Sequence, residues 1–367
     1  MEIIVPNLYN CVMEVFISHE SALEYWRLHF EASGICASRR KAVLPNTPPE
    51  TDLLRMKNIE GLSSPLHILL RNPSARRTLQ PVTQHVFSVN TPNSCFVNIG
   101  EGLMVSTPEF CFLQLAARLP LAKLIELGYE LCGTYSMPNI SVPFDVPSVI
   151  PIVESEMPAL IDLRALGQKR YAAPSAVSAE ESKPPGQGFN TRLPLTSTKK
   201  LKAFLTGMPG VKGHKKAVRA LRYIADSSAS PMETRLAIIL ALSHKLGGYH
   251  FPLPEHNSRI VPVKAARKNS DKTYYACDMF WPDYGLAVEY DSDVYHTGPE
   301  RIAEDSKRRN ALAFMGVTVI TVTNKQIHSI SELEKVARVL AGRMGKKLRL
   351  TNPGFADAHL ELRKLLR

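Results

Sequence analysis

Two short β-rich runs joined by a turn constrain the fold of this 367-residue chain more than any other feature of its sequence. The runs are Tyr274–Phe280 and Leu286–Tyr290, and the residues between them are Trp281-Pro282-Asp283-Tyr284-Gly285. Proline, aspartate and glycine favour a tight turn, so the sequence predicts an antiparallel hairpin. We expect this hairpin to be symmetric about Asp283 and Tyr284.

Under this symmetry Asp278 lies opposite Glu289, and Ala276 lies opposite Asp291. Since successive side chains of a strand point to opposite faces, the three carboxylates share one face. The residues expected to face the core are Cys277, Met279, Leu286 and Val288. Facing like charges destabilise a hairpin, unless a cation lies between them or one carboxylate is protonated. Such oxygen ligands suit Mg²⁺ or Mn²⁺. The alternative is a solvent-facing strand face that forms salt bridges with nearby Lys or Arg.

A helix is predicted ahead of the hairpin. Ser230-Pro231-Met232-Glu233 combines a serine N-cap, a proline in the first turn and a glutamate at capping-box spacing. The helix is expected to continue toward Leu246, where Gly247-Gly248 ends it. Short strands are predicted near Tyr249–Pro252 and Arg259–Val263.

These motifs together resemble the PD-(D/E)XK nuclease superfamily, in particular the small bacterial domains related to very-short-patch-repair endonucleases. The resemblance covers about Ser230–Arg343. The residues that carry it are Asp278–Pro282, Leu286–Asp291, His296, Asp305-x-x-Arg308-Arg309-Asn310-x-Leu312 and Gly316–Thr323. It implies a restriction-endonuclease-like α/β domain built of a helix, a mixed sheet and a further helix, preceded here by an α+β module.

The resemblance also implies an endonuclease that hydrolyses phosphodiester bonds with Mg²⁺ or Mn²⁺. Asp278 and Glu289 would hold the metal, joined by Glu233 from the family's first helix. The family's lysine, two residues after the glutamate, is replaced here by Asp291, which could bind metal or act as a base but leaves activity open. His296 is either a residue that orients or deprotonates water, or a hydrogen-bonded structural histidine.

The charge of the chain favours a nucleic-acid partner, and the nuclease resemblance implies DNA ahead of RNA. The net charge is +11, and between Ala165 and Ile224 there are 12 Lys or Arg residues against two acids. Basic surfaces attract phosphate backbones, although a solvated linker has the same composition. The candidate phosphate contacts are Lys199, Lys200, Lys212, Lys215, Lys216, Arg308 and Arg309.

The N-terminal part resembles, on less specific motifs, the type IV abortive-infection antitoxins. Strands are predicted at Leu66–Leu70, His85–Val89 and Cys95–Ile99, followed by a capped helix after Ser106 or Thr107 and another at Leu121–Leu131. This resemblance implies a protein partner and a setting in phage defence or toxin–antitoxin control; the alternative is a plain α+β interaction module.

The predicted organisation has four parts. They are a helical region at 1–60, the α+β module at 61–165, a basic Pro/Gly/Ser-rich linker at 166–198 and the nuclease-type domain at 199–367, with its core at 230–343.

Apolar runs are too short to span a membrane, and the N-terminus lacks the pattern of a secretion signal. Scattered cysteines without a C-x-x-C pair indicate reduced thiols in a cytoplasmic protein. The competing function is a catalytically inactive, DNA-binding antitoxin or repressor on the same fold.

Overall fold

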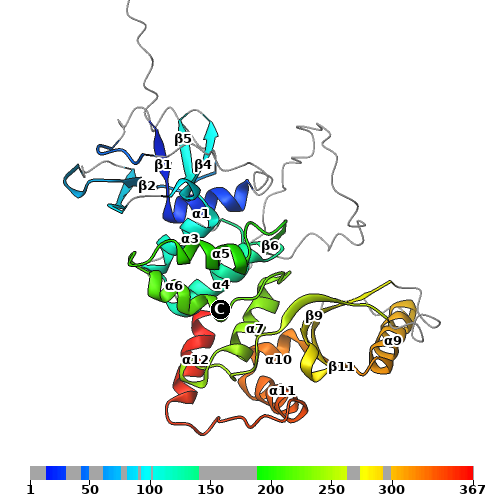
Figure 1. Cartoon of the computed structure of the whole chain (residues 1–367). Coiled ribbons are helices and arrows are strands. Elements are labelled where there is room, and N and C mark those ends of the chain that lie inside the picture. Colours follow the sequence, from blue (N-terminus) through cyan, green and yellow to red (C-terminus); the bar gives the residue numbers. More distant parts are fainter. Residues whose placement is uncertain are drawn as a thin grey trace, which may run out of the picture. The chain divides into compact units, whose positions relative to one another are not determined.

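The computed structural model describes residues 14–29, 43–48, 61–75, 81–89, 92–100, 102–139, 188–262, 273–291 and 299–366. They form a mixed α/β structure with mixed sheets, as predicted at this coarse level (Figure 1). The described residues up to Asn139 and those from Phe189 onward group into one compact unit by their contacts. Most of the predicted linker at 166–198 lies outside the described residues.

The N-terminal sheet has five strands in the order β3-β2-β1-β5-β4. Their bounds are Val15–Ile17 for β1, Leu66–Leu70 for β2, Val82–Val86 for β3, Phe96–Gly100 for β4 and Leu103–Ser106 for β5. The pairs β1–β5 and β2–β3 are parallel, whereas β1–β2 and β4–β5 are antiparallel. The strand expected at His85–Val89 forms three residues earlier, because its parallel pairing with β2 begins at Val82 opposite Leu66.

Three helices follow or cover this sheet: α1 (His19–Leu28), α3 (Pro108–Ala116) and α4 (Leu121–Cys132). Thr107 caps α3, since its hydroxyl accepts a hydrogen bond from the backbone N–H of Phe110, and Pro108 occupies the first helical position, as expected. Phe110 is fully buried and meets the edge of Phe96 with ring centroids 5.5 Å apart. The packing of α3 beside the strands therefore forms the apolar centre of this region.

Two further helices, α5 (Thr198–Thr206) and α6 (His214–Leu221), pack against α3 and α4. Ser197 caps α5, and the carboxylate of Asp226 accepts hydrogen bonds from the backbone and hydroxyl of Thr198. A two-stranded antiparallel ladder joins β6 (Tyr135–Ser136) to β7 (Asn190–Thr191). Gly213, with a left-handed φ of 93°, precedes the first turn of α6, and the helix ends at Leu221.

The C-terminal sheet has the strand order β11-β10-β9-β8. Along the chain the elements are α7 (Pro231–Ala241), β8 (Glu255–Ile260), β9 (Tyr275–Trp281), β10 (Leu286–Asp291), α9 (Pro299–Phe314) and β11 (Thr318–Thr323). Strands β8, β9 and β10 form an antiparallel meander, and β11 runs parallel to β10 after the α9 crossover. Ser230 caps α7, and Pro231 occupies its first turn, as predicted.

Two local predictions in this region were wrong. Helix α7 ends at Ala241, and no strand forms at Tyr249–Pro252. The backbone N–H groups of Tyr249 and Phe251 instead donate to the last carbonyls of α7, those of Ile239 and Leu240, at 2.9 Å each. Because this segment satisfies the open end of the helix, it needs no strand partner. The strand expected at Arg259–Val263 forms earlier, as β8.

The last helices of the chain are α10 (Asn324–His328), α11 (Ile330–Arg343) and α12 (Phe355–Leu365). Short 3₁₀ turns lie at Pro73–Ala75 and Asn93–Cys95 in the N-terminal region and at His244–Leu246 and Pro282–Tyr284 in the C-terminal region. One side of the sheet, with Met279 and Val288, joins the main core, while Ala287 on the other side packs with Leu312 of α9. None of the helices among the described residues has the length and apolar character needed to cross a membrane.

Candidate functional sites on two sheets

The predicted hairpin forms with the predicted symmetry. Trp281 pairs with Leu286, Phe280 with Ala287 and Met279 with Val288. The turn closes through Pro282–Tyr284 and Gly285, whose φ of 50° is left-handed. A side chain at Gly285 would lie 2.7 Å from the carbonyl oxygen of Gly316, so glycine suits both the turn and the neighbouring loop.

Asp278 lies where this pairing stops. Beyond Met279 and Val288 the two strands part, and the carboxylate of Asp278 accepts a 2.8 Å hydrogen bond from the backbone N–H of Tyr290. The predicted core residues Cys277, Met279, Leu286 and Val288 are all buried. They do not share one face, however: Cys277 packs with Ala287 on the α9 side, whereas Met279 joins the main core. The side chains of β9 therefore do not alternate regularly between the two faces of the sheet around Asp278.

Glu289 is partly buried and forms an ion pair with Arg308 of α9. Nη1 of Arg308 donates to Oε2 at 3.2 Å, while Nη2 donates both to Oε1 and to the carbonyl oxygen of Ala276. Burial raises the pKa of Glu289, the positive charge of Arg308 opposes that rise, and the negative charge of Asp278 adds to it. The two acids thus influence each other across the parting strands, and one of them already has a salt-bridge partner.

Glu233 is buried at the start of α7. Its carboxylate accepts hydrogen bonds from the hydroxyl of Ser230 at 2.9 Å, the backbone N–H of Ala229 at 3.0 Å and the side chain of Asn257 at 3.3 Å. Asp291, at the end of β10 opposite Thr323, is exposed. Within the described residues, Glu233, Asp278, Glu289 and Asp291 supply no three ligand atoms within 4.8 Å of one another.

His296 lies outside the described residues. Of the two candidate arginines, Arg308 contacts Glu289, and Arg309 is exposed on α9 with its Nε donating to the carbonyl oxygen of Asp305 at 3.3 Å. The predicted phosphate contacts on this helix are therefore not equivalent, because one of them is already engaged by a carboxylate.

The structure brings together three of the five candidate lysines. Lys212, Lys215 and Lys216 line a pocket of about 440 Å³ at the start of α6, which also includes His214. Lys216 extends along its wall and donates to the carbonyl oxygen of Leu119 at 2.9 Å. Lys199 and Lys200 are exposed on α5 and do not line this pocket.

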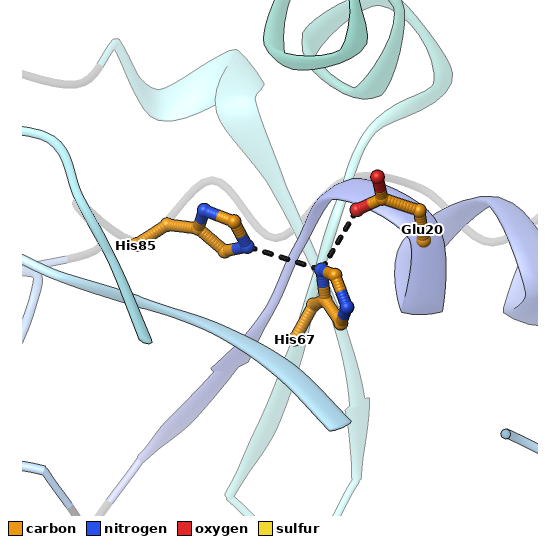
Figure 2. A group of neighbouring side chains, drawn as sticks. All are labelled: Glu20, His67 and His85. Carbon is orange, nitrogen blue, oxygen red and sulfur yellow. Dashed lines mark hydrogen bonds and ion pairs between the residues drawn. The ribbon is translucent and has the colours of Figure 1, made fainter. Parts of the chain in front are cut away.

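A different cluster, which the sequence interpretation missed, lies on the N-terminal sheet (Figure 2). Glu20 comes from the first turn of α1, His67 from β2 and His85 from β3. Nδ1 of His67 lies 2.7 Å from Oε2 of Glu20 and 3.0 Å from Nε2 of His85. The only sequence signal was one histidine in each of two predicted strands, and it fixed neither their pairing nor the position of α1.

Comparisons with protein-family models, with curated proteins and with solved structures gave no match to this chain. The arguments for function below therefore depend on the geometry of these sites and on the motifs of the sequence.

Proposed function

We propose that the chain is a divalent-metal-dependent nuclease that hydrolyses phosphodiester bonds of nucleic acid, with DNA favoured over RNA. The observation that carries this proposal is that Asp278 and Glu289 interact electrostatically where the pairing of β9 and β10 ends. The order α7, β8–β10, α9 and β11 agrees with the helix, mixed sheet and helix of the PD-(D/E)XK resemblance.

The donor set fits a hard divalent ion. Mg²⁺ in proteins binds through one or two carboxylates and keeps several waters or substrate phosphate oxygens. Asp278 and Glu289 would hold such an ion, which supplies Lewis-acid activation of water and of the phosphate. Since Glu289 binds cations only when ionised, and burial raises its pKa, activity should increase with pH as this group loses its proton.

Arg308 has a defined part in this proposal. It neutralises Glu289 in the absence of substrate, and it lies on the same helix as the exposed Arg309. If Glu289 held a metal ion instead of Arg308, the guanidinium of Arg308 would be available to pair with a phosphate oxygen, for which it is well suited. Glu233 acts as a positioning residue, because its hydrogen bonds hold the start of α7 to Asn257 of β8.

The lysine pocket at the start of α6 would supply contacts to the phosphate backbone. Lys212 and Lys215 are exposed and carry the charge that counterion release requires, and Lys216 forms part of the wall. Affinity for nucleic acid should therefore fall steeply as salt concentration rises, and replacement of Lys212 and Lys215 by glutamine should reduce that dependence.

The second candidate function is nucleic-acid binding without catalysis, as in an antitoxin or repressor. Two observations favour it: Arg308 already pairs with Glu289, and Asp291 stands where the family has a lysine. Both functions use the basic surface, so binding does not distinguish them, whereas cleavage does.

A cleavage assay with the full chain tests the proposal. Plasmid, linear DNA and RNA are incubated with Mg²⁺, Mn²⁺ or EDTA. We expect metal-dependent cleavage that Asp278→Ala and Glu289→Ala abolish, while Asp283→Asn, an exposed acid of the same hairpin, cuts at the wild-type rate. Salt-sensitive binding without cleavage under any of these conditions would instead support the second function. Full activity in Asp278→Ala and Glu289→Ala would refute the site.

A further inference from the structure

We propose that Glu20, His67 and His85 form a binding site for a divalent transition-metal ion of the Zn²⁺ class (Figure 2). None of these residues belongs to the proposed nuclease site. In the described part of the chain, they are the one group of three such side chains whose ligand atoms all lie within 4.8 Å of one another. Figure 2 shows a ring nitrogen of His85 and a carboxylate oxygen of Glu20 both directed at the same ring nitrogen of His67.

The close contacts among Glu20, His67 and His85 need more donated protons than the ring nitrogens can supply. Nδ1 of His67 has two close neighbours, Oε2 of Glu20 and Nε2 of His85, but one ring nitrogen carries at most one proton. Oε2 of Glu20 is buried, and although it lies within ion-pair distance of His67, it has no well-aligned hydrogen bond. A bound cation would satisfy the lone pairs of all three atoms at once.

The spacing of the ligand atoms is close to that of a metal centre. Two ligands about 2.0–2.1 Å from a tetrahedral Zn²⁺ lie about 3.3–3.4 Å apart. The two contacts of His67 Nδ1, at 2.7 and 3.0 Å, are shorter than this by about 0.3–0.7 Å. Small rotations of the side chains are therefore enough to admit the ion, without any change in the pairing of the strands.

The surrounding backbone holds these side chains in place. The N–H of His67 donates to the hydroxyl of Ser21, and its carbonyl oxygen accepts from the N–H of Ser18, both at 2.9 Å. Arg118 binds the other oxygen of Glu20, Oε1, at 2.8 Å, which leaves Oε2 directed at the histidines. Ligands that are oriented by such outer partners bind metal more tightly than free ones.

His85 is held from its other side. Its ring stacks on that of His19, with centroids 3.6 Å apart and planes 17° from parallel. His19 in turn is fixed by its own backbone, whose N–H donates to Oε1 of Gln114 at 3.0 Å. The imidazole of His85 therefore has a restricted orientation toward His67, although β2 and β3 place the two histidines two residues out of register.

The ligand types decide the class of metal. Two imidazoles and one carboxylate suit Zn²⁺, Co²⁺ and similar ions, whereas Mg²⁺ and Ca²⁺ prefer all-oxygen sites. Three protein ligands leave a fourth position for water or for another ligand. The positive charge of Arg118 lowers the affinity somewhat, but it lies on the far oxygen of the carboxylate. A bound Zn²⁺ would link α1 to β2 and to β3, the edge strand of the N-terminal sheet.

Metal titrations of the full-length chain test the site. The protein is stripped with EDTA, dialysed, and titrated with Zn²⁺ by calorimetry, and in parallel with Co²⁺ while the visible d–d absorption is recorded. We expect one equivalent of Zn²⁺ to bind at this site, a Co²⁺ spectrum of low coordination number, and no competition from millimolar Mg²⁺. Binding should weaken at least about tenfold in His67→Ala, His85→Ala and Glu20→Gln.

Two controls assign the binding to this cluster. His328→Ala, an exposed histidine of α10, and Asp283→Asn, an exposed acid of the C-terminal hairpin, should both keep the wild-type Zn²⁺ affinity. Glu20→Gln is nearly isosteric, so its loss of binding with an unchanged circular dichroism spectrum separates the loss of a ligand from misfolding. Wild-type protein that binds no Zn²⁺, or Zn²⁺ binding of unchanged stoichiometry and affinity in all three ligand variants, would overturn the proposal. Neither result bears on cleavage by the nuclease site.

Discussion

At the scale of single residues, His256 is a buried histidine in an unfavourable environment. It is only 5% exposed on β8, faces Met279 across the sheet and meets the ring edge of Tyr129 at 5.5 Å. Neither of its ring nitrogens has a well-aligned hydrogen bond. Burial lowers the pKa of His256 to about 4, against a slight opposing effect from the backbone of Asp278.

This depressed pKa predicts how stability changes with pH. Between pH 6.5 and about 4 the unfolded chain takes up a proton at His256 that the folded chain does not. The contribution of neutral His256 to stability is therefore fully present above pH 6.5. As the pH falls to about 4, the unfolding free energy should decrease by about 3 kcal/mol because of this group. Denaturant titrations at several pH values should show a smaller loss in His256→Leu, with His328→Gln as control. Parallel curves for His256→Leu and wild type would contradict the prediction.

Glu233 offers a second test at this scale, because its two possible roles respond differently to one substitution. A glutamine at this position can still accept the hydrogen bonds of a capping box, so Glu233→Gln should melt close to wild type, whereas Glu233→Ala should lose about 1 kcal/mol. A positioning role predicts that Glu233→Gln retains cleavage. A well-folded Glu233→Gln protein without activity would instead make Glu233 a metal ligand.

At the scale of elements, helix α1 is fixed to α4 by a buried ion pair. Arg27 donates to both oxygens of Glu130, at 2.8 and 2.7 Å, and the Glu130 side chain is only 4% exposed. Glu130 also accepts from the backbone N–H of Met137 at 3.1 Å. This bidentate contact joins α1 to α4 through charge-assisted hydrogen bonds.

Breaking this pair from one side should cost more than removing it. Arg27→Met leaves a buried carboxylate without its cation, and we expect a loss of about 3–5 kcal/mol in unfolding free energy. The double variant Arg27→Met with Glu130→Leu should recover part of that loss, because the buried carboxylate is removed together with its partner, although buried Arg192 also loses a neighbouring negative charge. A double-mutant cycle by chemical denaturation measures the coupling. Additive effects of the two substitutions would show that the pair contributes nothing.

The element scale also shows what the sequence could predict. The register of β9 and β10 followed from the turn residues, because a tight turn between two short strands permits few pairings. The irregular alternation around Asp278 did not follow, since strict alternation assumes a regular strand, and Asn257 on the neighbouring β8 has a φ of 49°. The ion pair of Glu289 was foreseen only as the general alternative of a salt-bridged strand face, without Arg308 as its partner.

At the scale of the whole molecule, the sequence predicted single elements, such as the β9–β10 hairpin, better than the contacts between elements. The linker composition suggested a boundary near residue 198, and that boundary stays a prediction. The structure adds that α6 and the loop after it pack on α4, where Ile224 covers Gly128. The cluster of Glu20, His67 and His85 was missed for a related reason: it depends on parallel pairing and helix placement, and no local pattern encodes either.

The contact between Gly128 and Ile224 yields a prediction about how these segments are joined. Glycine in a helix is usually less stable than alanine by about 1 kcal/mol, so Gly128→Ala in an unhindered helix would stabilise the protein. Here an added Cβ would lie 2.2 Å from Cδ1 of Ile224 and 3.2 Å from Cε2 of Phe112, both buried side chains. We therefore expect Gly128→Ala to lower the unfolding free energy by about 1–3 kcal/mol.

A matched pair of variants separates this packing effect from helix propensity. Gly342→Ala lies in α11 with nothing within 4 Å of the new Cβ, and it should raise the unfolding free energy by up to about 1 kcal/mol. Adding Ile224→Val to Gly128→Ala removes the methyl group nearest the new Cβ, and part of the lost stability should return. Thermal and denaturant unfolding of all four proteins give the comparison. If Gly128→Ala is as stabilising as Gly342→Ala, then Ile224 does not pack on α4, and the segment after residue 198 is joined to the N-terminal helices in another way.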